Sequence, residues 1–498
     1  MEALDKMFGV TEAGSDVNTE IRAGGATFLT MAYILLVNPS MLSATGIPFE
    51  DALFATAVAA FVGCMVMAFW ANLPFALAPG MGLNAYFAFT VAAPWAMAVP
   101  WEIALAAILV QGVIFLILSL PQVGVRTAMI NAIPTDLKIA TGAGIGMFLA
   151  IIGLREMGWV QGDNATLVNL GDTGAMDPAS SGAFWAMIGL IAIAVMMARK
   201  LPFAIIGGVL AVSVIGWILG VNDPYNEGYP VVEFCAGATA DTCVVNPNFV
   251  AGVPGEGVAE PPTKIFDFVG IPEETLFAAV TALGDISGSD LGWGGFISVM
   301  VTFLFVDIFD TAGTLYSVGR QAGYVDENDE LHNSDEAFMS DAAATIVGAL
   351  CGTSTTTTYI ESAAGIEEGG KTGLTAATVG VLMLSGLFFA DIFASIPQYA
   401  MACALVVVGA MMMRQAADID WSNSVMAVPA FLTMVMMPFT YSIADGIAWG
   451  IISYCAIMTG SGKFKDINPV VGGIAVFMLL FYMTINGEKT ILDMILGA

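Results

Sequence analysis

Residues 299–317 read VMVTFLFVDIFDTAGTLYS, and this stretch decides the class of the protein. It has the apolar length of a membrane-spanning helix, yet Asp307 and Asp310 lie in its middle. Ionisable groups inside a membrane segment are rare and usually functional, because removing a charge from water is costly. Residues three apart lie on about the same side of a helix. The stretch therefore predicts a polar site inside a membrane protein.

The composition points to the same class. Of 498 residues, 57% are hydrophobic and 11% are charged, whereas about a quarter of the residues are charged in soluble proteins. We therefore expect an all-α polytopic membrane protein embedded in the lipid bilayer. Residues 1–25 are polar and acidic, unlike a cleavable signal peptide. The net charge of −29 argues against nucleic acid as a partner, since nucleic acid is itself anionic.

Apolar runs separated by short polar turns predict about fourteen membrane spans. Basic residues in the short connections fall mainly on the side of the N-terminus, which predicts a cytoplasmic N-terminus in the plasma membrane. The polar segment 220–293 then faces the exterior and divides the chain into halves. Cys235 and Cys243 in this segment are candidates for a local disulfide. A further apolar run, 470–483, either crosses the membrane or lies in its interface.

The two halves resemble each other weakly. Gly24-Gly25 and Gly294-Gly295 open corresponding apolar runs, and Ile133-Pro134 and Ile396-Pro397 precede another such pair. Two repeats with an odd number of spans must insert with opposite orientation. Inverted repeats are typical of secondary transporters, whose sites lie between the repeats near the middle of the membrane.

The third span of each half is interrupted. Residues 76–89 read ALAPGMGLNAYFAF, in which Gly80 and Gly82 come just before Asn84. In the second half a run of Ser and Thr, 354–358, precedes Tyr359 and Glu361, and such a run favours extended backbone over helix. Irregular backbone at membrane depth is tolerated only inside protein or beside a watery cavity. These segments therefore predict the binding site.

Four polar residues are expected to converge there: Asn84, Asp307, Asp310 and Glu361. Carboxyl and amide groups suit a flat, uncharged ligand with alternating N–H and C=O edges. Because desolvation disfavours a charged carboxylate, such acids can also exchange a proton near neutral pH. The neighbouring Tyr86, Phe87 and Tyr359 either stack on a ring or serve ordinary packing.

Other acids allow structural interpretations. Asp310 either contributes to the site or only bridges to Thr311 or another helix. Asp341, Asp391 and Asp445 also lie in or near apolar runs, and we interpret them as helix-end or domain-contact residues because none is in an interrupted segment. We expect neither a metal nor an organic cofactor.

Four long blocks resemble a known family: ANLPFALAPGMGLNAYF, FLFVDIFDTAGTL, GTSTTTTYIESAAGIEEGGKTGLTA and MPFTYSIADGIAWG. They look like the nucleobase/cation symporters of the nucleobase–ascorbate transporter superfamily, in the AzgA-like branch of hypoxanthine, guanine and adenine permeases. The resemblance implies two inverted repeats of seven spans, a homodimer, and import of purine nucleobases coupled to protons by alternating access. It also implies that the chain is not an enzyme.

The resemblance further implies a division of the chain. A core domain would comprise residues 26–120 (spans one to four) and 294–394 (spans eight to eleven). A gate domain would comprise residues 121–219 (spans five to seven) and 395–460 (spans twelve to fourteen). Residues 1–25 would form a cytoplasmic N-terminus, 220–293 an extracytosolic acidic loop, and 461–498 a C-terminal segment.

Site roles follow from the same motifs. Asp307 and Glu361 would be the principal purine ligands, with Asn84 and Tyr359 contributing and Gly80, Gly82 and Thr358 forming the site backbone. Asp310 and Glu361 would support proton coupling. Some family branches have a histidine one turn after the first acid, where this chain has Thr311. Proton coupling would then use the carboxylates alone, and sodium is the alternative coupling ion.

Three other functions compete with this one. The same fold can carry uracil, xanthine or a small anion. An intramembrane aspartyl protease would use Asp307 and Asp310 as acids that share a proton, but the Gly-x-Gly-Asp pattern of those enzymes is missing around them. A channel is disfavoured because conduction needs several weak sites in sequence rather than one dense polar cluster.

Overall fold

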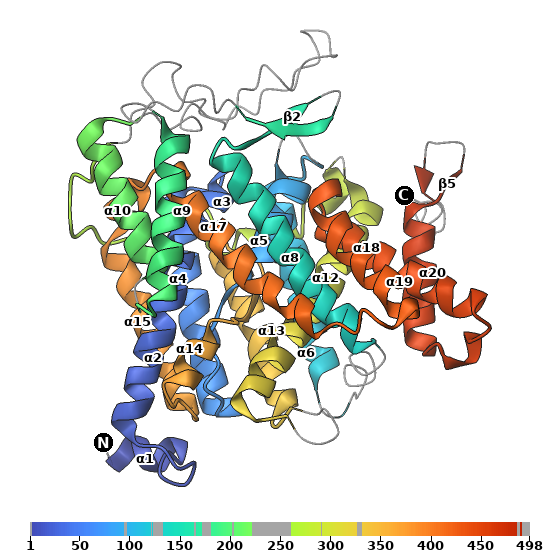
Figure 1. Cartoon of the computed structure of the whole chain (residues 1–498), viewed down its shortest axis with the longest axis horizontal. Coiled ribbons are helices and arrows are strands. Elements are labelled where there is room, and N and C mark those ends of the chain that lie inside the picture. The colour runs from blue at the N-terminus through green and yellow to red at the C-terminus, as the bar shows by residue number, and fades with distance from the viewer. Residues whose placement is uncertain are drawn as a thin grey trace.

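The computed structural model describes residues 2–93, 97–120, 122, 133–163, 166–171, 181–201, 204–221, 260–289, 291–325, 331–485 and 489–490. Within them, seven helices are long and apolar enough to cross a membrane. The chain is a multi-pass membrane protein, and its helices stand side by side in one bundle (Figure 1). Cys235 and Cys243, with most of the segment 220–293, lie outside the described residues.

The first half of the chain contains these helices: α1 Glu2–Phe8, α2 Val17–Met31, α3 Ile34–Ser43, α4 Phe49–Val66, α5 Met81–Ala85, α6 Trp101–Ser119, α8 Thr135–Glu156, α9 Gly182–Ala198 and α10 Ala204–Leu219. Short π-helical segments, Met67–Ala71 and Tyr86–Ala92, extend α4 and α5. A hairpin of β2 Val160–Asp163 and β3 Leu167–Leu170 follows α8.

The second half contains these helices: α11 Ala278–Ala282, α12 Gly292–Ala322, α13 Ser334–Cys351, α14 Ser362–Glu367, α15 Gly373–Leu384, α16 Ala390–Ala394, α17 Gln398–Met413, α18 Ser424–Thr440, α19 Ile443–Gly460 and α20 Pro469–Tyr482. A small pair of strands, β5 Thr484–Ile485 and β6 Lys489–Thr490, follows α20. The apolar run 470–483 is therefore a helix, and its Phe477 packs against Phe305 of α12 with ring centroids 6.2 Å apart.

The first long helix begins earlier than the apolar run alone predicts. Its start at Val17, rather than at residue 26, is set by Asp16, whose carboxylate accepts from the backbone N–H groups of Asn18 and Thr19. Such a cap satisfies donors that the first helical turn leaves open. An apolar run does not reveal a helix cap, so the sequence assigned the polar first turns of α2 to the N-terminal segment 1–25.

The two interrupted segments meet as a buried pair of strands. β1 (Leu77–Pro79) pairs antiparallel with β4 (Thr356–Thr358), and Ala78 lies opposite Thr357. The pairing continues beyond the strands, since Gly80 N donates to Thr355 O over 2.8 Å and Tyr359 N to Ala76 O over 2.9 Å. Each strand supplies the backbone partners that the other lacks inside the bundle. The predicted extended stretches in both halves of the chain are confirmed.

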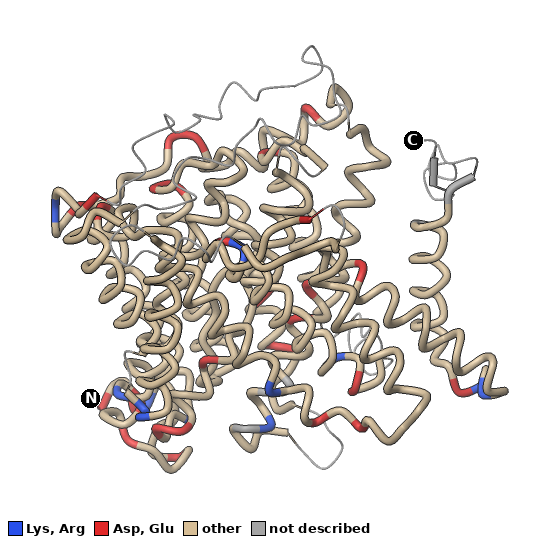
Figure 2. Tube along the Cα trace, turned by 45° about the horizontal axis from the view of Figure 1, so that its top comes forward, with Lys and Arg blue, Asp and Glu red and all other residues tan. Residues whose placement is uncertain are grey.

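Two helices from opposite halves, α8 and α17, pack along each other (Figure 1). Their close approach depends on glycine, because a Cβ on Gly146 would lie 2.7 Å from the carbonyl oxygen of Gly409. Charged residues gather near the ends of the helices, and a few acids lie within the bundle (Figure 2). The acids inside the bundle are therefore the residues whose contacts have to be identified.

Candidate functional site

A cavity lies between the strand pair and the helices α8 and α17. The cavity is partly open, and its free volume is about 40 Å³, below the range of small-molecule sites. Its walls are formed by Tyr33, Met81, Gly82, Ile145, Asp310, Thr314, Thr357, Thr358, Tyr359, Ile360, Glu361, Val408 and Met412. The strand pair and the residues that follow it supply most of the polar groups, whereas α8 and α17 supply only apolar side chains. The cavity thus has one polar wall and one apolar wall.

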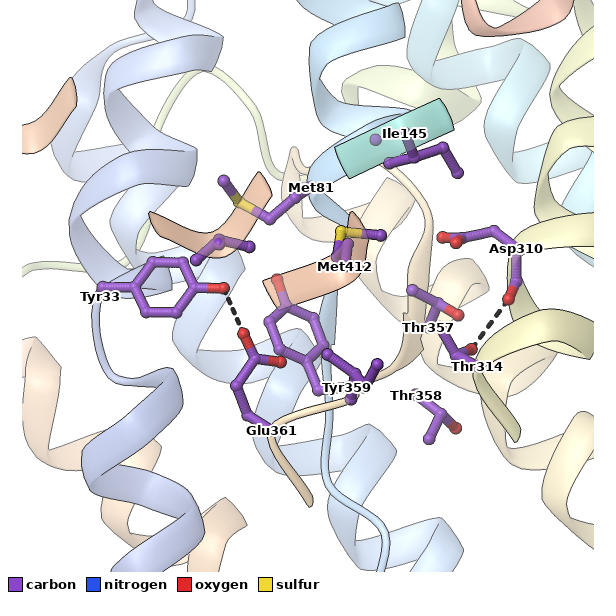
Figure 3. A pocket seen from close by; sticks show the side chains of 13 residues that line it. Tyr33, Met81, Ile145, Asp310, Thr314, Thr357, Thr358, Tyr359, Glu361 and Met412 are labelled. Atoms are coloured by element: carbon purple, nitrogen blue, oxygen red, sulfur yellow. Dashed lines mark hydrogen bonds between the residues drawn. The ribbon is translucent and has the colours of Figure 1, made fainter. Parts of the chain in front are cut away.

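Glu361 is held at the cavity by Tyr33, which lies between α2 and α3. It immediately precedes α14 and is buried, and its Oε1 accepts from the Tyr33 hydroxyl over 2.7 Å. Tyr33 lies in the short turn between α2 and α3. Figure 3 shows the two side chains pointing toward each other, with the Tyr359 ring beside them. This hydrogen bond fixes the carboxyl group while leaving Oε2 for a ligand.

Tyr359 presents its ring to the same cavity. Its hydroxyl donates to the carbonyl oxygen of Pro79 over 2.6 Å, which ties the residue after β4 to the end of β1. The ring is thereby held in one orientation beside Glu361 (Figure 3). A fixed aromatic face next to a carboxyl group can stack on a flat ligand while the acid bonds to its edge.

Asp310 lines the opposite side of the cavity, together with Thr314 and Thr357 (Figure 3). Its Oδ2 lies 3.6 Å from the position that a Cβ on Gly80 would occupy. The predicted backbone residues also meet here: Gly82 and Thr358 line the cavity, and Gly80 packs against Thr357.

Asp307 and Asn84 do not line the cavity. Asp307 points to α6, where its Oδ2 accepts from Gln111 Nε2 over 3.0 Å, and the Asn84 Oδ1 accepts from the Ser354 hydroxyl. Three helical residues are about 60° short of a full turn, so Asp307 and Asp310 face different neighbours. Of the four polar residues expected to converge, the structure brings Asp310 and Glu361 to one cavity and places the other two behind its wall.

Asp341 was wrongly interpreted as a helix-end or domain-contact residue. It lies well inside α13, fully buried, and its carboxylate accepts from the Thr358 backbone N–H over 3.2 Å and from the Thr358 hydroxyl over 3.0 Å. It therefore holds the end of β4 from behind. Asp391 and Asp445 do lie in the first turns of α16 and α19, as predicted.

Tyr86 and Phe87 serve packing. Both rings lie against Phe303 of α12, with centroid distances of 5.2 Å and 6.4 Å, and neither lines the cavity. Tyr33, Gln111 and Asp341 are the polar residues around the site that the sequence did not indicate. Gln111 and Asp341 lie within helices and Tyr33 in the turn between α2 and α3, and only a polar group in an apolar stretch marked them.

The charge of the cavity restricts its ligands. The described lining includes two carboxyl groups and no basic side chain, which disfavours a small anion as cargo. Among the described residues, no group of three or more His, Cys, Asp or Glu side chains has the arrangement of a metal site. A neutral ligand with N–H donors fits these acceptors best.

We expect Tyr33→Phe to weaken ligand binding without preventing folding. The ring still fills its place, but Glu361 loses its hydroxyl donor. A hydrogen bond to a charged group contributes about 1.5 to 3 kcal/mol, or roughly tenfold to a hundredfold in affinity. Initial uptake rates over a range of substrate concentrations should show a raised KM at unchanged protein level. An unchanged KM would remove Tyr33 from the site.

Comparisons with known proteins identify the family of the chain. The sequence model of the permease family, named for xanthine and uracil, matches residues 18–449. The adenine permease AdeP of Escherichia coli is 34% identical over 97% of this chain and 97% of its own. The guanine/hypoxanthine permeases PbuO and PbuG of Bacillus subtilis are 36% and 37% identical, each over 96% of this chain and 99% of their own.

Solved structures show the same kind of fold. The transmembrane domain of the cyanobacterial bicarbonate transporter BicA superposes with a TM-score of 0.52 at 15% identity, covering 87% of this chain and 96% of that one. The anion transporter SLC26A9 gives a TM-score of 0.54 at 11% identity, over 92% and 69% of the two chains. At such identities the likeness concerns the fold alone.

Proposed function

Because the chain belongs to the permease family of nucleobase and ascorbate transporters, we propose that it imports purine nucleobases across the plasma membrane by proton-coupled alternating access. It is a transporter and not an enzyme. The substrate class is supported by the relatives named for adenine, guanine and hypoxanthine. The cavity supplies the matching chemistry.

The observation that carries this proposal is the pairing of Glu361 and Tyr359 on one wall of the cavity. A purine is a flat ring whose edge alternates N–H and carbonyl or ring-nitrogen groups. The carboxyl of Glu361 bonds to that edge, the Tyr359 ring stacks on the face, and Asp310 lies across the cavity. The apolar side chains of Ile145 and Met412 cover the remaining surface of the ligand.

Alternating access requires one wall of the cavity to move past the other. The strand pair, α12 and α14 form the ligand-holding wall, which corresponds to the proposed core domain, and α8 and α17 belong to the proposed gate domain. At the cavity, α8 contributes Ile145 and α17 contributes Val408 and Met412. Apolar contacts are non-directional, so they permit sliding. We further propose a homodimer with a cytoplasmic N-terminus, as the resemblance implies.

A competition assay tests the substrate class. The chain is produced in a host that lacks purine uptake, and labelled hypoxanthine is offered with an excess of unlabelled guanine, adenine, xanthine or uracil. We expect hypoxanthine uptake, competition by guanine or adenine, and none by uracil. Competition by uracil alone would change the substrate class, competition by xanthine alone would move the preference to that purine, and no uptake of any labelled purine would refute the proposal.

The coupling ion is tested in the same cells. We expect a protonophore to collapse accumulation of labelled hypoxanthine, because the inward proton gradient would drive it. The control is uptake at fixed pH with and without sodium. Full accumulation in the presence of the protonophore and sodium would assign sodium as the coupling ion.

A further inference from the structure

Helix α20 comes after both of the repeats that the family resemblance implies. The last span of the second repeat is expected to end by residue 460, whereas α20 begins at Pro469. The described lining of the ligand cavity includes none of its residues. Figure 1 shows α20 at the edge of the bundle, next to α19. Its role has to be inferred from the helices that it contacts.

The first of these helices is α19, which packs along α20. Side chains three or four residues apart share one face of a helix, and on α20 such a face is buried. It consists of Val471, Ile474, Ala475 and Met478. The thiol of Cys455 on α19 lies 3.9 Å from the carbonyl oxygen of Val471. The first half of α20 is therefore in close contact with α19.

The end of α20 adds a polar and an aromatic contact to the same helix. The Tyr482 hydroxyl donates to Asp445 Oδ1, and the Tyr482 ring lies 6.1 Å from that of Trp449, centroid to centroid. Asp445 and Trp449 are one turn apart on α19. Helix α20 is thus attached to α19 at both of its ends.

The second neighbour is α12, and the contact with it is an aromatic pair. Phe477 of α20 and Phe305 of α12 are both half-buried, with ring centroids 6.2 Å apart and planes inclined by 43°. Helices α12 and α19 also contact each other directly. Helix α20 therefore lies over the boundary between them and contacts both.

The two helices that α20 joins come from the two walls of the cavity. α12 carries Asp310 on the polar wall, and α19 belongs to the proposed gate domain, where its Ile443 approaches Gly82. Alternating access moves one wall past the other, and the inference rests on this part of the proposed function. A helix attached to one neighbour at both ends and to the other by one ring moves with the first.

We propose that α20 is a strap, meaning a helix that moves with α19 and holds α12 through Phe477 and Phe305 in the present arrangement of the two walls. An aromatic pair of this kind shifts an equilibrium by roughly two- to tenfold, so the transport cycle can break it at every turn. A permanent link between α20 and α12 should then stop the cycle. A permanent link between α20 and α19 should not.

Two reversible cross-links test the strap. Phe305→Cys with Phe477→Cys allows α20 to be joined to α12, and Trp449→Cys with Tyr482→Cys allows it to be joined to α19. Each double variant is treated in membrane vesicles with a bifunctional thiosulfonate reagent, and mass spectrometry gives the linked fraction. Uptake of labelled hypoxanthine is measured before treatment, after treatment and after reduction. We expect the α12 link to remove uptake in proportion to the linked fraction, reduction to restore it, and the α19 link to leave it unchanged.

The single variant Phe477→Cys, treated in the same way, is the control for modification without a link. Where Tyr482→Cys lowers uptake before treatment, Val471→Cys replaces that pair, because the native Cys455 lies beside Val471. Since the strap only has to release α12, the untreated Phe305→Cys and Phe477→Cys protein should keep its uptake.

Three results would overturn the proposal: full uptake with α20 linked to α12, loss of uptake with α20 linked to α19, or loss of uptake in the untreated α12 pair at an unchanged amount of protein in the membrane. The unaltered protein is assayed in parallel. If it takes up no purine, the proposed function fails. A change of uptake that appears only on linking concerns the strap alone.

Discussion

Replacing Glu361 by Gln should abolish measurable accumulation of hypoxanthine while the protein remains in the membrane. The amide has nearly the same shape, but it exchanges one acceptor oxygen for a donor. The Tyr33 hydroxyl, 2.7 Å from Oε1, and the N–H edge of the ligand then compete for a single oxygen. One hydrogen bond is then lost, and the new amide N–H group faces a donor. Losing a hydrogen bond to a charged group costs about 1.5 to 3 kcal/mol, so affinity falls by roughly tenfold to a hundredfold or more.

The matched control is Glu368→Gln. Glu368 ends the same short helix, but its side chain is 50% exposed and its partner Arg22 is 66% exposed. Exposed ion pairs contribute little to stability, so transport should be close to that of the unaltered protein. Uptake of labelled hypoxanthine and the amount of protein in isolated membranes are measured for both variants. Normal uptake by Glu361→Gln would refute the site.

Replacing Gly82 by Val should stop transport by filling the boundary between the cavity and its apolar wall. A Cβ at this position lies 2.8 Å from Cγ2 of Ile145 on α8 and 3.1 Å from Cδ1 of Ile443 on α19. The two further methyl groups of Val then have no free space and enter the cavity that Gly82 lines. Overpacking of this kind costs about 1 to 3 kcal/mol. Where that cost falls on the state in which α8 and α19 approach Gly82, the population of that state drops by roughly fivefold to a hundredfold, and uptake drops with it.

Gly25→Val is the control for the same substitution elsewhere. A Cβ on Gly25, within α2, has nothing within 4 Å, so the added side chain meets open space. Uptake and thermal unfolding of the detergent-solubilised protein are compared for the two variants. We expect Gly82→Val to lose uptake and Gly25→Val to keep it. Equal uptake by both would mean that α8 and α19 do not need to approach Gly82 during transport.

The predicted interruption of two helices rests on strong local signals. Four threonines in a row disfavour helix, and Pro79 with Gly80 ends one, so the sequence predicted extended backbone near both sites. Because each strand needs hydrogen-bond partners inside the bundle, their meeting as β1 and β4 is a direct consequence. Glu361 follows one of these strands, and for that reason its place at the cavity was predictable.

The different surroundings of Asp307 and Asp310 could not be predicted from local sequence signals. Sequence spacing puts both on one side of α12, but a rotation of about 60° between them is enough to send one toward α6 and the other into the cavity. Which acid faces which neighbour depends on how α12 is rotated against α6 and β4. That rotation is set by the packing of many side chains and leaves no trace in the local sequence.

The sequence by itself determined the membrane class, the family, the acidic helix and the two broken segments. These follow from composition, motif and backbone preference, which act over a few residues. The tertiary structure alone decided that Tyr33 holds Glu361, that Asp341 supports Thr358 and that Gln111 pairs with Asp307. These partners are far apart in the chain, and a buried polar group takes whichever partner the packed helices bring within hydrogen-bond distance.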